Sequence, residues 1–252
     1  MTNVFYLSKK STVQNTIVHT YLKCFFTKRF NVIKSQEAFN FYSHLAGMIA
    51  AVIGTVFLVN IATDSASMVI TALVYGCSIT FLFSASSLYH AFKQQENELS
   101  FWRKMDRLAI FCMIAGSYTP VCYFFLDDNW RLPMISIQWA LVAFGACSQI
   151  FFPRAPRMIY AVIFLIMGWM LVFPMSQILD AMTSNQATLL FAGGAAFTAG
   201  ALFYAIKKPL LMPGIFSFHE LFHVMVLVGG ACHYALIYSA FSAASLATPA
   251  AF

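Results

Sequence analysis

The residues of this chain best placed to do chemistry are two histidines four positions apart, His219 and His223, with Glu220 between them. On a helix, side chains at i and i+4 lie on one face about one turn apart. Two imidazole rings placed in this way can bind one metal ion together. The pattern H-E-x-x-H is also typical of zinc proteases, in which the glutamate is a general base. The pattern alone leaves open what supplies a third ligand and which carboxylate handles a water molecule.

The composition indicates where such a site must lie. Of the 252 residues, 60% are hydrophobic and only 10% are charged, and the mean hydropathy is +0.74. A soluble domain has about 25% charged and about 45–50% apolar residues. We therefore expect an all-α integral membrane protein, because unpaired backbone groups cannot face lipid. The net charge of +6 does not indicate nucleic-acid binding, since the basic residues lie in short segments beside apolar stretches, where they orient the chain.

Seven apolar stretches follow a basic N-terminal tail, and each is near the ~20 residues that cross a bilayer core. They are 41–62, 68–92, 106–126, 133–152, 157–178, 186–206 and 216–241. We expect a cytoplasmic tail over 1–36, a seven-helix membrane domain over 37–241 and a short external C-terminal end over 242–252. All lysines and arginines except Arg131 lie on the side of the tail. By the positive-inside rule, the N-terminus is then cytoplasmic and the C-terminus outside.

This topology brings polar residues from three stretches to one depth. His90 closes the second stretch, Asp106 opens the third, and His219 and His223 open the seventh. All four are therefore expected near the cytoplasmic leaflet. His90, His219 and His223 would be three metal ligands, which leaves a fourth position for water, as in catalytic zinc sites.

Asp106, Ser86 and Glu220 are the candidate catalytic residues around this metal. Asp106 could hold or deprotonate the water, although a carboxylate at a helix N-terminus also has a structural explanation. Ser86, four residues before His90, could steady the water or a developing oxyanion, or bond back to its own helix. Glu220 is rotated by about 100° from His219 and competes with Asp106 for the role of base.

Three further ionisable residues are expected to have other roles. His44 opens the first stretch and could support the ligands or only pack between helices. His233 follows His223 by ten residues, which is about 15 Å along a helix, so it cannot bind the same ion and is expected to pack. Glu37, just before the first stretch, is expected to be a solvated interfacial charge.

Three sequence blocks carry a resemblance to a known family. They are Ser86-Ser87-Leu88-Tyr89-His90, then Met105-Asp106-Arg107-Leu108-Ala109-Ile110 with 115–120, and His219-Glu220-Leu221-Phe222-His223 with 232–234. In this order, and with Glu37 and the block 43–47 before them, they resemble the PAQR (progestin and adipoQ receptor) family on its bacterial hemolysin III-like branch. The resemblance covers about residues 37–241, and the basic tail is longer than expected for that branch.

The resemblance implies a seven-helix bundle with zinc held by His90, His219 and His223, and with Ser86 and Asp106 beside it. The wider superfamily includes alkaline ceramidases. A zinc-dependent hydrolase of a ceramide-like or other fatty-acyl membrane lipid, in a bacterial inner membrane, is therefore expected. The alternative is a non-catalytic zinc-stabilised receptor or lipid sensor. A zinc protease is disfavoured because no acidic residue follows His223, and a pore-forming hemolysin because no stretch has a regular polar stripe.

Overall fold

A computed structural model describes residues 35–63, 65–95, 98–212 and 216–247, and almost all of the predicted tail over 1–36 lies outside them. In this part of the chain the regular elements are helices. They are α2 (Ser35–Ile61), α3 (Ala66–Phe92), α4 (Phe101–Phe125), α5 (Asp128–Phe151), α6 (Arg157–Trp169), the 3-10 helix η1 (Met170–Val172), α7 (Met175–Ala181), α8 (Ser184–Ile206) and α9 (Phe218–Ala247). The prediction of an all-α membrane protein is thus confirmed for the described residues, and α9 runs past the predicted boundary at 241.

Six of the described helices are long and apolar enough to cross a bilayer, namely α2, α3, α4, α5, α8 and α9. α6, η1 and α7 meet the same criterion only together, as a pair bent by 61°. The sequence predicted one continuous helix over 157–178, and this is wrong, because the chain breaks at Phe173 and Pro174. Proline lacks a backbone N–H and cannot continue the helical hydrogen bonds. Pro174, with φ −93° and ψ 25°, leaves helical geometry, whereas Phe173 before it keeps that geometry. The described chain therefore has six candidate spans, or seven if the bent pair crosses as one.

Four helices begin at a side chain whose oxygen accepts a hydrogen bond from the first turn. The capping residues are Ser65 for α3, Ser100 for α4, Asp127 for α5 and Thr183 for α8. Such caps satisfy backbone N–H groups that have no partner inside the helix. The short polar residues between the apolar stretches therefore determine where these helices start.

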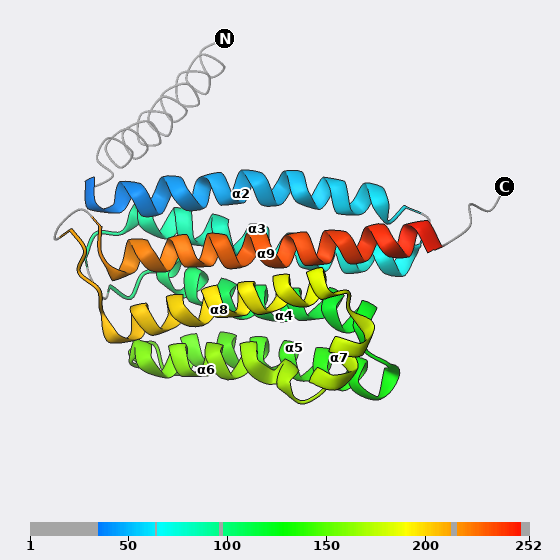
Figure 1. The fold of residues 1–252 in the computed structure, drawn as a ribbon. Coiled ribbons are helices and arrows are strands. Elements are labelled where there is room, and N and C mark those ends of the chain that lie inside the picture. The colour runs from blue at the N-terminus through cyan, green and yellow to red at the C-terminus, as the bar shows by residue number, and fades with distance from the viewer. Residues whose placement is uncertain (1–34, 64, 96–97, 213–215, 248–252) are drawn as a thin grey trace, which may run out of the picture.

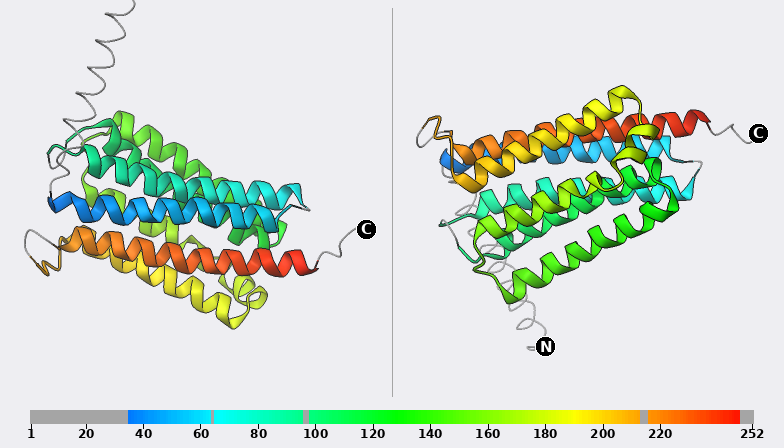
Figure 2. Two further views of the ribbon diagram at one scale, coloured as in Figure 1. Left: turned by 90° about the horizontal axis from the view of Figure 1, so that it is seen from above. Right: turned by 60° about the horizontal axis from the view of Figure 1, so that its bottom comes forward.

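The helices lie side by side along one direction (Figures 1 and 2). α2 packs on α3 and α9, α3 on α4, α4 on α6, α6 on α8, and α8 on α9, so these helices close a ring, with α5 packed outside it on α4. Figure 1 shows the end of α3 and the starts of α2, α4 and α9 at the same end of the bundle. His90 is thereby brought close to the start of α9, although 129 residues separate it from His219.

The described basic side chains gather at this same end. They belong to the ends of α3 and α8, to the starts of α4 and α6, and to the connections between these helices, whereas Arg131 lies near the start of α5 at the other end. The outward faces are apolar, with Val52, Val56 and Phe57 about half exposed. Both features agree with a membrane-embedded bundle, and the assignment of this end to the cytoplasm stays a prediction.

The contact between α2 and α3 requires a glycine. A Cβ atom at Gly76 would overlap the Thr55 side chain, whose Oγ1 is held by a 2.7 Å hydrogen bond to the carbonyl oxygen of Ala51. Gly76→Ala is therefore expected to destabilise the bundle by about 1–3 kcal/mol through overpacking and to lower its Tm in detergent. Gly168→Ala is the matched control, because a Cβ there has open space. Equal Tm values for the two variants would contradict this account of the contact.

Candidate metal centre

Three histidines from α3 and α9 meet at the end of the bundle. One ring nitrogen from each of His90, His219 and His223 lies within 4.8 Å of the others, and together they form a group that could hold a metal ion. The Nε2 atoms of His90 and His219 are 3.3 Å apart. Nitrogen ligands about 2.0–2.1 Å from a tetrahedral zinc ion are separated by about 3.3–3.4 Å. This pair therefore already has the spacing that a shared ion requires.

The surroundings of the histidines also fit a metal. His90 and His223 are each 2% exposed, and Nδ1 of His223 has no hydrogen-bond partner among the described residues. A buried polar atom without a partner is costly, and a metal ion would supply that partner. Imidazole ligands suit zinc and several other transition metals. The residues present thus fit a metal ion, with zinc as the proposed one.

Glu37, at the start of α2, holds His90 in position. Its Oε2 accepts a 2.6 Å hydrogen bond from Nδ1 of His90, and its Oε1 accepts one of 2.6 Å from Nζ of Lys93. With the proton on Nδ1, the Nε2 of His90 faces His219 and can bind a metal. The expectation that Glu37 is a solvated charge is wrong, because its side chain is 13% exposed and doubly paired.

A sequence signal for Glu37 existed. Glu37, Asn40 and His44 stand at i, i+3 and i+7, so they form one polar face on an otherwise apolar helix. Asn40 and His44 are 1% and 2% exposed. Polar side chains on one face at the start of a membrane span indicate that this face is turned to other polar groups.

Glu37→Gln is expected to weaken metal binding by about 10–100-fold, as for other partners of metal-bound histidines. Glutamine keeps the size of the side chain but loses the charge that fixes the proton on Nδ1 of His90. The measurement is competition for the metal with a chelator of known affinity. Glu98→Gln is the control, because Glu98 lies at the same end but bonds to the backbone N–H of Gln94. An equal loss in both variants would contradict the role of Glu37.

Glu220 joins the start of α9 to α2. Its Oε2 accepts hydrogen bonds of 2.7 Å from the backbone N–H and the hydroxyl of Ser217, and its Oε1 accepts one of 2.9 Å from Nδ2 of Asn40. A glutamate three residues after a serine is the common pattern at helix starts. This arrangement positions the turn that carries His219 and His223. It favours a structural role for Glu220 over the role of general base that the sequence left open.

Asp106 on α4 and Ser86 on α3 lie beside the histidines. The side chains of Ser86 and His90 are both close enough to that of Asp106 to interact with it. Asp106 and Ser86 line the same cavity as His219 and His223. A carboxylate, a hydroxyl and three imidazoles are therefore gathered at one place from α3, α4 and α9.

The other two histidines of the membrane region lie differently. The His44 ring packs on that of His223, with 3.8 Å between centroids, so His44 supports a candidate ligand directly. His233 lies further along α9, where its Nε2 is 3.3 Å from the carbonyl oxygen of Leu190 on α8. His233 thus packs between α8 and α9, as the sequence predicted.

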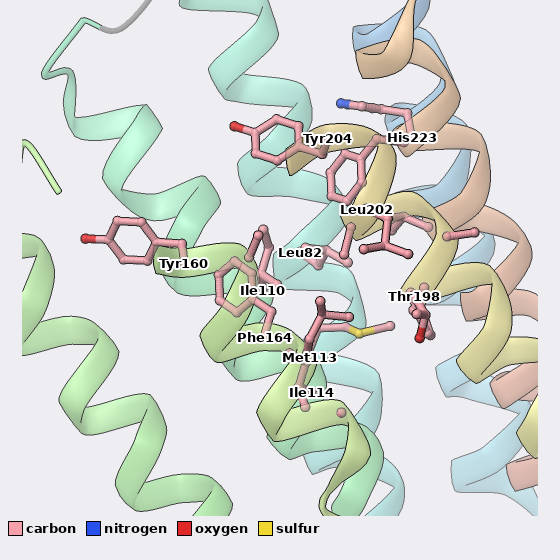
Figure 3. A pocket seen from close by; sticks show the side chains of 18 of the residues that line it. Leu82, Ile110, Met113, Ile114, Tyr160, Phe164, Thr198, Leu202, Tyr204 and His223 are labelled. Atoms are coloured by element: carbon pink, nitrogen blue, oxygen red, sulfur yellow. The ribbon is translucent and has the colours of Figure 1, made fainter. Parts of the chain in front are cut away.

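A cavity of about 1010 Å³ extends from the histidines into the bundle. Figure 3 shows Tyr204 and His223 at one end of it, and the apolar side chains of Ile110, Met113 and Phe164 further along. Large pockets with apolar walls and a few polar groups are typical of small-molecule sites. The polar groups here are concentrated at the end that holds the candidate metal ligands.

The cavity also reaches the outer surface of the bundle. Trp169 on α6 and Phe191 and Leu202 on α8 line it, yet these side chains are 53%, 48% and 48% exposed. A hydrogen bond of 3.1 Å from Nε1 of Trp169 to Oγ1 of Thr198 crosses between the two helices. The wall of the cavity that α6 and α8 form is therefore partly exposed on the apolar face of the protein.

Known proteins are similar to this chain in sequence. A family model described as "Haemolysin-III related" matches residues 32–234. Hemolysin-3 of Bacillus cereus is 30% identical over 198 residues, which are 78% of this chain and 87% of the relative. The Hemolysin-3 homolog of Bacillus subtilis is 27% identical over 198 residues, or 78% and 90% of the two chains. The human monocyte to macrophage differentiation factor is 24% identical over 213 residues, or 81% and 83%.

The matched region extends from the end of the tail into α9 and includes the three histidines. The bacterial relatives are consistent with an inner-membrane location for such a bundle. The chain is therefore a multi-span helical membrane protein that belongs to the Haemolysin-III related family, the hemolysin III-like branch of the PAQR proteins.

Proposed function

We propose that this protein is a zinc-dependent membrane hydrolase that cleaves an amide or ester bond of an acyl lipid, as ceramidases do. The observation that carries the proposal is that Asp106, Ser86 and the three histidines meet at the polar end of a large apolar cavity. A purely structural metal would need no such cavity beside it. The partly exposed wall that α6 and α8 form would give an acyl chain a route from the bilayer.

Each residue has a role in this proposal. A zinc ion held by His90, His219 and His223 would lower the pKa of a coordinated water towards about 7 and polarise a carbonyl group. Asp106 accepts a proton from the attacking water on a carboxylate oxygen and returns it to the leaving amine or alkoxide. The hydroxyl of Ser86 orients the Asp106 carboxylate. Glu37 keeps the proton of His90 on Nδ1.

A second candidate function is a zinc-stabilised receptor or lipid sensor without catalysis. One feature of the helix packing supports this second function. α3 and α9 supply the three histidines but are not among the pairs of helices packed closely on each other, so a metal would tie them together. The two functions differ in the fourth coordination position of the metal. In a hydrolase an exchangeable water would occupy it, and in a receptor or sensor stabilised by zinc a protein side chain would.

The test is an assay of the purified, zinc-loaded protein against ceramides and ester-linked acyl lipids, with released fatty acid measured by mass spectrometry. Release by the native protein and none by His90→Ala would support the hydrolase. X-ray absorption at the zinc edge reports the fourth ligand in the same sample. No release from any lipid by fully metal-loaded protein, together with a fourth protein ligand, would refute the hydrolase and favour the sensor.

A further inference from the structure

The polar end of the cavity carries several cationic side chains. Among the described residues that line it, the cations are Lys93, Arg103, Arg107 and Arg157, and the acids are Glu37, Asp106 and Glu220. Four positive groups thus face three negative ones before any metal is bound. A divalent ion at the histidines would increase the excess of positive charge, which favours an anionic ligand.

The acidic side chains that line the cavity already interact with other residues of the protein. Glu37 binds His90 and Lys93, Glu220 binds Ser217 and Asn40, and Asp106 interacts with Ser86. Neither Arg107 nor Arg157 forms an ion pair with an acid in the described part of the chain. Arg107 is close enough to Asp106 to interact with it electrostatically, but neither guanidinium group is paired directly with a carboxylate among the described residues, so both can bind a ligand.

Aromatic rings hold both guanidinium groups in place. Cζ of Arg107 lies 4.6 Å from the centroid of the Tyr160 ring, and Cζ of Arg157 lies 5.5 Å from that of Tyr204 and 5.8 Å from that of Phe218. Such contacts use the face of a guanidinium group. The N–H groups along its edge stay free to bind the oxygens of a phosphate.

One aromatic ring connects Arg157 with the candidate metal centre. The Tyr204 ring, which contacts Arg157, also lies 5.7 Å from the His219 ring. Arg157 is therefore two ring contacts away from a candidate metal ligand. A head group bound by the arginines would leave the first atoms of its acyl chain near the histidines.

Membrane orientation alone does not account for these positions. The positive-inside rule asks only for cations in the loops at this end. Lys104 and Arg154 are at the same end, next to the same helices, and do not line the cavity. Arg107 and Arg157 differ from them in facing the cavity and in packing on its aromatic residues.

We propose that the cavity binds an acyl lipid with a phosphate in its head group, with the phosphate oxygens on Arg107 and Arg157 and the acyl chain along the apolar walls. This deepens the proposed function and rests on the same site. It sets a phosphate-bearing acyl lipid above a neutral ceramide as the preferred substrate class.

The first experiment measures binding of tritiated oleoyl lysophosphatidate to the zinc-loaded protein in detergent. Unlabelled lysophosphatidate is expected to displace it at a concentration at least about tenfold lower than monooleoylglycerol does, because each charge-assisted contact contributes about a factor of ten. Glycerol 3-phosphate is expected not to compete. Equal displacement by the two lipids would overturn the proposal, and displacement by glycerol 3-phosphate as strong as that by lysophosphatidate would show a free-phosphate site instead.

The second experiment compares two double variants with the same change of charge at the same end. Arg107→Gln/Arg157→Gln is expected to weaken lysophosphatidate binding by about tenfold or more and to leave monooleoylglycerol binding unchanged. Lys104→Gln/Arg154→Gln is expected to change neither. An equal loss in both double variants would refute the assignment. If the first double variant does not fold, the single variants Arg107→Gln and Arg157→Gln replace it.

A third variant separates this inference from the proposed function. His90→Ala removes a candidate metal ligand but neither arginine, so it is expected to keep the preference for lysophosphatidate over monooleoylglycerol. An absence of hydrolysis in the native protein would then refute the hydrolase alone. Loss of the preference in His90→Ala would contradict recognition by the arginines.

Discussion

Replacing His90 with alanine is expected to remove the bound metal and to abolish hydrolysis. His90 is the one candidate ligand from α3, and its Nε2 lies 3.3 Å from that of His219. Without it, the two histidines of α9 make an incomplete site. Because a metal supplies several kcal/mol of transition-state stabilisation, turnover should fall by about 10³-fold or more. The measurement is the metal content per protein molecule together with fatty-acid release.

His233→Gln is the matched control for this variant. His233 is also a buried membrane histidine, but it bonds to the carbonyl oxygen of Leu190 and lies away from the cluster. We expect His233→Gln to keep its metal at the native stoichiometry. A His90→Ala variant that also kept it would rule out the three-histidine centre.

Asp106→Asn is expected to keep the metal and lose the reaction. Asparagine preserves the shape of the side chain and a partner for Ser86 but cannot accept a proton from water. General base catalysis contributes about 10²–10⁴-fold to a rate, and turnover should fall by that factor. Native metal content with this loss of fatty-acid release, measured on the same preparation, would assign the proton transfer to Asp106.

Glu220→Gln tests the rival carboxylate. An amide at this position cannot accept all the hydrogen bonds that Ser217 and Asn40 now donate to the carboxylate. The start of α9 should therefore become less stable, which a lower Tm would report. If Glu220→Gln abolished turnover with native metal content while Asp106→Asn kept it, Glu220 would be the base and our assignment would be wrong.

Much of the fold could be predicted from the sequence because few backbone conformations are stable in lipid. Apolar stretches must be helices, and successive spans alternate in direction. Counting them was therefore enough to place His90 and His219 at one end of the bundle. The break at Pro174 was missed because hydropathy measures how apolar a stretch is and does not report its direction.

The sequence predicts how far along its helix each site residue lies, but not the direction in which its side chain points around the helix axis. Depth in the membrane follows from position in a span, so the three histidines and Asp106 could be selected together. The contact between Glu37 and His90 could not be predicted in this way, because it depends on how α2 is rotated against α3. The same holds for Arg107 and Arg157, whose location near membrane ends explained their charge but not the side to which they face.

The bend between α6 and α7 has a consequence for the length of the ligand. The furthest residues along this segment that line the cavity are Leu171, Val172 and Met175, and there the chain turns by 61° into α7. Beyond Met175 no residue of α7 lines the cavity, so the lining that this segment contributes ends where the chain turns. If the cavity binds an acyl chain as we propose, the distance between the histidines and this bend sets the length of chain that it accommodates.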